Sequence, residues 1–107
     1  MVDHAIGTLA IGMSTDAARD SIVEGYRERI SAVDGEILDA LNRRVALVRE
    51  LHAHKRARGY PMRDPARERE LIGSLAAANG GPLSAQGLER LYRLLVEICT
   101  EEAARPD

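Results

Sequence analysis

The chain has 107 residues, the usual size of one domain, and a monomer this short buries only a modest share of its surface. It contains no Phe, no Trp and only three Tyr, so packing must depend on aliphatic side chains, and its many Ala, Leu, Glu and Arg residues favour helices. The formal charge of −2 offers no overall basic field for a nucleic-acid backbone, and no stretch approaches the ~20 apolar residues of a membrane span.

The single cysteine, Cys99, excludes an intrachain disulfide, and no Cys/His spacing resembles a zinc site. A reducing cytoplasm is the simplest compartment for such a chain, and we expect neither a metal nor another cofactor. Residues 1–13 include Asp3 and lack the basic start and apolar run of a secretory signal. We therefore predict a flexible arm over 1–13 and one helical domain over 14–107.

The first predicted helix is long, because no proline interrupts the helical apolar spacing from about Ser14 to Ala57. Ser14 or Thr15 can cap its start, and Gly59 and Pro61 follow its end. A helix of roughly 40 residues would be about 60 Å long at 1.5 Å per residue, too long for a compact monomer of this size. The long helix therefore predicts a partner.

Two further helices are predicted by their start signals. Asp64 and Pro65 suit the cap and first position of a helix over 65–78. An Asn-Gly-Gly-Pro cluster then breaks the chain, and Ser84 can cap a helix over 84–104. The expected fold is all-α, with a long, a short and a medium helix.

Arg44 is the only permanent charge in the apolar seam of the long helix. The seam comprises Val23, Tyr26, Ile30, Val33, Ile37, Ala40, Arg44, Leu47, Leu51 and His54. Desolvating a guanidinium is costly unless it has a partner. A buried ion pair, a snorkelling side chain or an anion bound inside the bundle would each explain Arg44.

Lys55 follows Arg44 by eleven residues, so both cations point to about the same side, roughly 16 Å apart along the axis. The two could line one cleft. Lys55 also has an ordinary interpretation, because a lysine near a helix C-terminus stabilises the helix dipole.

Glu68 lies on the apolar face of the second predicted helix, three, four and seven residues before Leu71, Ile72 and Leu75, with Arg67 beside it. Acidic residues favour a helix N-terminus, so Glu68 has an ordinary interpretation too. The surrounding charges could equally be a solvated run, which comprises Arg63, Arg67, Glu68, Arg69 and Glu70. The residues alone predict a helical bundle that encloses an anionic ligand.

Four segments resemble the AroQ-class, all-helical chorismate mutases. Residues 26–34, Tyr-Arg-Glu-Arg-Ile-Ser-Ala-Val-Asp, resemble the opening of the family's long helix. Asn42-Arg43-Arg44 resembles its mid-helix arginine element and His54-Lys55 its helix-end lysine. Residues 61–69, Pro-Met-Arg-Asp-Pro-Ala-Arg-Glu-Arg, resemble its loop-to-second-helix motif and are the most specific part. The resemblance covers roughly residues 20–104 and needs no gap between the first and last of these motifs.

The resemblance implies an intertwined six-helix homodimer that converts chorismate to prephenate. It further implies that each site combines Arg27 of one subunit with Arg44, Lys55, Asp64, Arg67 and Glu68 of the other. The rearrangement is concerted and needs no nucleophile or metal, so positioning and electrostatics must supply the catalysis. Arg27 and Arg44 would grip the two carboxylates, Lys55 would face the ether oxygen, and Glu68 and the Asp64 region would face the ring hydroxyl.

The third helix departs from the best-known bacterial pattern of a small hydroxyl residue followed, four positions later, by a glutamine that faces the ether oxygen. Cys99 and Ala103 stand at those positions. Cys99 is isosteric with serine but suits core packing, and Ala103 cannot donate a hydrogen bond. Glu102 is a candidate substitute that would have to be protonated to donate, giving higher activity at acidic pH. Alternatively, Glu101 and Glu102 are a solvated helix end and turnover is modest.

Three other functions remain open at this point. Two are enzymes of the same fold, a mutase for 4-amino-4-deoxychorismate and an isochorismate pyruvate-lyase. Lys55 at the helix end argues against the lyase, but it does not separate chorismate from its 4-amino analogue. The third is a non-catalytic helical dimer that serves as an interaction module. Some free-standing family members are activated by docking onto the first enzyme of the shikimate pathway, and the resemblance leaves such a partner open.

Overall fold

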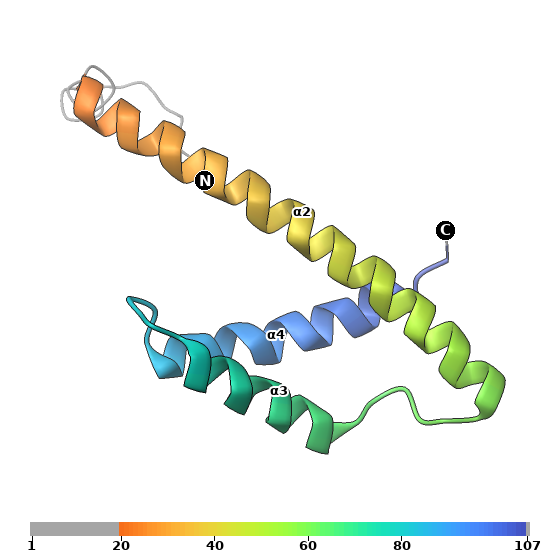
Figure 1. The fold of residues 1–107 in the computed structure, drawn as a ribbon. Helices are drawn as coiled ribbons and strands as arrows, with labels where there is room; N and C mark the ends of the chain where they lie inside the picture. Colours follow the sequence, from red (N-terminus) through yellow and green to blue (C-terminus); the bar gives the residue numbers. More distant parts are fainter. Residues whose placement is uncertain (1–19, 107) are drawn as a thin grey trace. The chain divides into compact units, whose positions relative to one another are not determined.

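The computed structural model describes residues 20–106, which form three helices and no strand. They are α2 (Ser21–Arg58), α3 (Pro65–Ala78) and α4 (Ala85–Ala104), labelled in Figure 1. The prediction of an all-α chain with a long, a short and a medium helix is confirmed. The chain divides into two units, Met1–Ala40 and Leu41–Asp107, and α2 contributes to both.

The start of α2 differs from the prediction. Asp20 is not helical, and its Oδ1 accepts hydrogen bonds from the backbone N–H groups of Ile22 at 2.9 Å and Val23 at 3.3 Å. Asp20 therefore caps the helix, and the prediction of an unbroken helix from Ser14 is wrong at this residue. The predicted cap at Ser14 or Thr15 and the predicted arm over 1–13 lie outside the described residues.

The described part of the first unit, residues 20–40, has no buried residue. Val23 is partly buried, but the other large apolar side chains are at least half exposed, and most of them repeat every three or four residues along one side of α2. They are Ile22, Tyr26, Ile30, Val33, Ile37 and Leu38. We call Tyr26, Ile30, Val33 and Ile37 the apolar stripe.

The second unit contains the buried residues of the described chain. α3 and α4 pack side by side as a helical hairpin (Figure 1). The hairpin turn is held by Asn79, whose side-chain amide donates to the Leu83 carbonyl at 2.8 Å and whose Oδ1 accepts from the Gly81 N–H at 2.9 Å. The core residues are Leu88, Val96, Cys99 and Ala103 of α4 and His52 of α2.

Candidate active site

The loop between α2 and α3 fixes the position of Lys55. Gly59 adopts a φ of 72°, the left-handed conformation that ends many helices, and the Tyr60 N–H donates to the Lys55 carbonyl at 2.9 Å. The Lys55 ammonium in turn donates to the Met62 carbonyl at 3.1 Å. An ammonium has three N–H donors, so Lys55 keeps two for a ligand.

Asp64 begins α3 as the sequence predicts. Its Oδ1 accepts from the Arg67 N–H at 3.1 Å, its carbonyl accepts from the Glu68 N–H at 3.0 Å, and Pro65 occupies the first helical position. The cap places Glu68 in the first turn, where the helix dipole stabilises a carboxylate. The Arg67 side chain is largely exposed and pairs with Glu70 at 3.3 Å.

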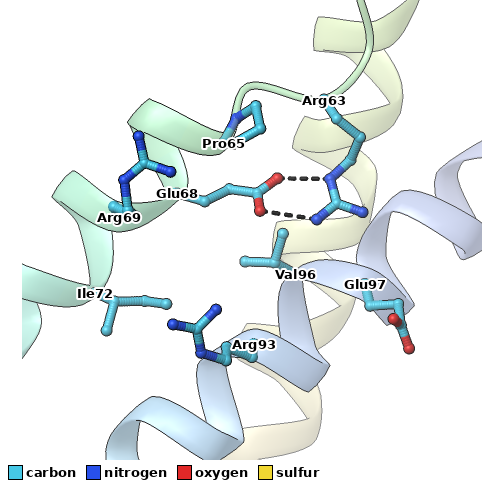
Figure 2. A pocket seen from close by; sticks show the side chains of 8 residues that line it. All are labelled: Arg63, Pro65, Glu68, Arg69, Ile72, Arg93, Val96 and Glu97. Atoms are coloured by element: carbon cyan, nitrogen blue, oxygen red, sulfur yellow. Dashed lines mark hydrogen bonds and ion pairs between the residues drawn. The ribbon is translucent and has the colours of Figure 1, made fainter.

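Glu68 forms a bidentate ion pair with Arg63 of the preceding loop, shown in Figure 2. The Arg63 Nε donates to Oε2 at 2.6 Å and its Nη2 donates to Oε1 at 2.8 Å. These hydrogen bonds lower the pKa of Glu68 below its ordinary value and raise the pKa of Arg63. The nearby Asp64 charge opposes this shift in the pKa of Glu68, and the Arg93 charge supports it.

Two cavities meet at Arg63. One, of about 500 Å³, lies between α3 and α4 and is lined by charged and apolar side chains (Figure 2), namely Arg63, Pro65, Glu68, Arg69, Ile72, Arg93, Val96 and Glu97. The other, of about 510 Å³, is lined by Lys55, Tyr60, Pro61, Arg63, Asp64 and Pro65. The loop thus brings three of the predicted site residues, Lys55, Asp64 and Glu68, to two neighbouring cavities.

Arg44 lies on the part of α2 that belongs to the second unit and is half-buried. Among the residues that the structure describes, no carboxylate forms an ion pair with it. The ion-pair explanation for Arg44 therefore finds no support within the described chain, and a snorkelling side chain and an anionic ligand remain as explanations. Arg27 is exposed and belongs to the first unit, so it is not placed relative to Arg44.

The C-terminal part of α4 holds the residues for which the sequence left alternatives. Cys99 is 2% exposed and Ala103 is 5% exposed, so both belong to the core of the second unit. The Glu102 carboxylate accepts from Arg105 at 3.1 Å, and its backbone carbonyl accepts from the Arg49 guanidinium at 3.3 Å. Both the side chain and the backbone carbonyl of Glu102 thus act as hydrogen-bond acceptors.

Sequence comparison adds a family to this geometry. The family model described as "Chorismate mutase type II" matches residues 26–103, which contain α2 from Tyr26 onward, the loop between α2 and α3, α3 and nearly all of α4. The chain belongs to the chorismate mutase type II family. The resemblance found in the sequence motifs is thereby confirmed.

Two solved structures of chorismate mutase from Thermus thermophilus are similar to this member of the family. Form II has a TM-score of 0.76 and 29% sequence identity, over 79% of this chain and 97% of that one. Form I has a TM-score of 0.71 and 30% identity, over 72% of this chain and 96% of that one. Their likeness supports the three-helix architecture.

Two curated relatives are bifunctional chorismate mutase/prephenate dehydratases. The protein from Aquifex aeolicus is 31% identical over 77 residues, which are 68% of this chain and 21% of that protein. The protein from Enterobacter agglomerans is 34% identical over 87 residues, which are 78% of this chain and 22% of that protein. This chain thus spans about a fifth of the length of the curated relatives.

The sequence did not single out Arg63 as a site residue of this chorismate mutase family member. It appeared in the motif at 61–69 and in the run of charges from 63 to 70 without a role of its own, and its spacing of five residues from Glu68 is not a helical pair spacing. A usable signal was its place before the Asp64 cap, since a loop residue there can fold back over the first helical turn.

In the described part of the chain, no helix is long and apolar enough to span a bilayer, and no cluster of three acidic, His or Cys residues could hold a metal.

Proposed function

We propose that this chain catalyses the rearrangement of chorismate to prephenate, an isomerisation in the biosynthesis of phenylalanine and tyrosine. The observation that carries the proposal is the half-buried Arg44, for which the described residues offer no carboxylate partner. Chorismate is a dicarboxylate and would supply one. Lys55, at helical spacing from Arg44 and fixed by the Met62 carbonyl, provides a second cation on the same segment of α2.

The reaction needs a compact substrate conformer rather than a chemical group from the protein. Arg44, together with Arg27, would grip the two carboxylates through bidentate hydrogen bonds and hold the enolpyruvyl arm over the ring. Binding both ends in this geometry removes the freedom that makes the reactive conformer rare in solution.

Charge stabilisation would come from Lys55. Negative charge grows on the ether oxygen as its C–O bond breaks, so a fixed ammonium stabilises the transition state more than the ground state. At the other end, Glu68 would accept the hydrogen bond of the ring hydroxyl. Asp64 would act through its backbone and its cap, and Arg67 through the local charge.

A second copy of this chain is the proposed partner. The apolar stripe on α2 is more than half exposed, at 57% for Tyr26, 59% for Ile30, 51% for Val33 and 51% for Ile37. Pairing two such stripes would bury them and would give the long helix α2 the partner that its length requires. Each site would then take Arg27 from the partner subunit. An activating shikimate-pathway enzyme and a cytoplasmic location stay predictions.

The replacement of the family's glutamine by Ala103 should affect the rate of the reaction and not the kind of reaction. Ala103 cannot contact the ether oxygen by a hydrogen bond, and the substitute at Glu102 stays a prediction. Its carboxylate is paired with Arg105, which favours the alternative of a solvated helix end and modest turnover. A flat pH profile of kcat would agree with that alternative.

The test is the loss of chorismate absorbance, with prephenate identified as the product. Replacing Lys55 or Arg44 by Ala should lower kcat/KM by at least about a hundredfold, as expected for removing a cation from a charge-stabilising site. Arg43→Ala and Arg56→Ala are matched controls, because each removes an exposed cation next to a site residue. They should stay near the wild-type rate.

Absence of turnover by a folded wild-type dimer would contradict the proposal. The 4-amino analogue and isochorismate would then be assayed with the same variants. Turnover that survives both Lys55→Ala and Arg44→Ala would contradict the assignment of these residues.

A further inference from the structure

Arg63 and Glu68 leave hydrogen-bonding capacity for a ligand despite their contact. A carboxylate has about four lone-pair positions, and the two bonds from Arg63 occupy one on each oxygen. The Glu68 side chain is 24% exposed and borders the cavity between α3 and α4. Glu68 can therefore accept a ligand hydroxyl while Arg63 remains bound to it.

Other charges near the pair come from three elements and balance in sign. The loop contributes Asp64, α3 contributes Arg69, and α4 contributes Arg93 and Glu97. Arg93 is itself bound to Glu89 at 2.6 Å. With Arg63 in place the ion pair is neutral, so Arg63 decides whether Glu68 presents a net negative charge to a ligand.

We propose that Arg63 is a positioning and specificity residue that neutralises Glu68, so that the site takes a ring with a neutral hydroxyl in preference to one with an ammonium group. This inference rests on the proposed function. It identifies the residue that would separate chorismate from its 4-amino analogue, a distinction that Glu68 alone leaves open. Arg63 contacts Glu68 and acts on the substrate through it.

Two electrostatic effects support the assignment. An unpaired Glu68 would repel the dianionic substrate and attract the protonated amine of the analogue, since aliphatic amines are charged at neutral pH. Arg63 also fixes both oxygens of Glu68 by parallel hydrogen bonds, which set the direction of the remaining lone pairs. Lysine at position 63 would keep the charge but lose that geometry.

The experiment compares kcat/KM for chorismate and for 4-amino-4-deoxychorismate in the wild-type protein, Arg63→Gln, Arg63→Lys and the control Arg90→Gln. Arg90 is an exposed residue of α4 outside the cavity between α3 and α4. Arg63→Gln should shift the ratio toward the amino substrate on the order of fivefold, the effect of one unit charge at about 4 Å in water. Arg63→Lys should keep most of the wild-type preference for chorismate, and Arg90→Gln should not change it.

The pH profile provides a second readout. An ionised Glu68 accepts the hydroxyl more strongly than a protonated one, and Arg63 lowers the pKa of Glu68. Loss of Arg63 should therefore move the acid-side fall of kcat/KM for chorismate to higher pH, with KM affected more than kcat.

An active wild-type protein whose substrate ratio and acid limb do not change in Arg63→Gln would overturn this inference and leave the proposed function intact. A similar change in Arg90→Gln would also overturn it. A wild-type protein that converts neither substrate would contradict the proposed function and this inference together.

Discussion

The two units of the chain differ in how far their apolar side chains are buried and their polar side chains are hydrogen-bonded. In the first unit, the described part of α2 exposes Tyr26, Ile30, Val33 and Ile37 and buries no residue. In the second, four α4 residues and His52 are buried, and the polar groups of the loop before α3 are bound within the chain. The second unit thus has an internal core, whereas the first has an apolar surface and no core among its described residues.

The difference separates two requirements of the proposed site. Lys55, Asp64 and Glu68 have positions set by contacts within a single chain. Arg27 shares its unit with the apolar stripe and has no such contact among the described residues. A site that needs Arg27 should therefore depend on the association of two subunits. A site that needs only Lys55, Asp64 and Glu68 should not.

The largest effect is expected from a substitution that disrupts the proposed dimer. Ile30→Asp puts a charge in the middle of the apolar stripe, and burying an unpaired carboxylate in an interface is strongly unfavourable. We expect dissociation to monomers and a fall in kcat/KM of at least about a hundredfold, because the carboxylate grip would lose one arginine. Sedimentation equilibrium and the chorismate assay would measure both.

Ser31→Asp is the matched control for this change. It introduces the same charge at the next exposed residue, which lies about 100° around the helix. A dimeric and active Ile30→Asp protein would contradict the proposed interface.

The next effect is recovery of activity by mixing two inactive variants. Arg27→Ala and Lys55→Ala homodimers should each have two defective sites, but a mixed dimer would have one intact site if each site combines two subunits. Equal mixing after unfolding and refolding should give about a quarter of the wild-type activity, because half of the dimers would be mixed and each would have one of two sites. Mixing that recovers no activity would contradict the sharing of Arg27.

Cap substitutions sharpen the comparison within the second unit. Asp64 and Ser84 cap α3 and α4 through equivalent bonds to the Arg67 and Gly87 N–H groups, at 3.1 and 3.0 Å. Replacing either by Ala should cost about 1 kcal/mol of unfolding free energy. Only Asp64→Ala should also lower kcat/KM, since that cap orients the turn that carries Glu68. Equal activity of the two variants in chorismate assays would count against a role for the Asp64 region.

The smallest expected effect is an acid dependence of stability. His52 is 4% exposed, and burial lowers its pKa, as do the charges of Lys55 and Arg56. The unfolded chain then binds a proton more readily than the folded one, so stability should fall as the pH drops through the ordinary histidine range near 6.5. Thermal melting at several pH values would measure this fall.

His52→Leu should weaken this pH dependence, whereas the exposed His54→Leu should retain it. The same fall in all three proteins would show that His52 does not cause it.

The sequence by itself determined the helices that have local signals. The predicted span 65–78 is the observed span of α3, and the third helix starts one residue after its predicted cap Ser84. Such bounds follow from groups within four residues of each other, which the sequence displays directly. The start of α2 was missed, because several residues before Ser21 could cap a helix equally well and local propensity does not choose between them.

The family resemblance predicted the candidate site residues, and the tertiary structure decided which side chains they contact. Arg63, Arg67 and Arg69 all stand within five residues of Glu68, yet it is Arg63 that binds it, because the loop after Gly59 carries Arg63 back over the first turn of α3. Likewise, the seam in the sequence includes His54, but the structure buries His52. Periodicity assigns a residue to a face of its own helix, whereas the contact partners depend on loop geometry and on how the helices pack.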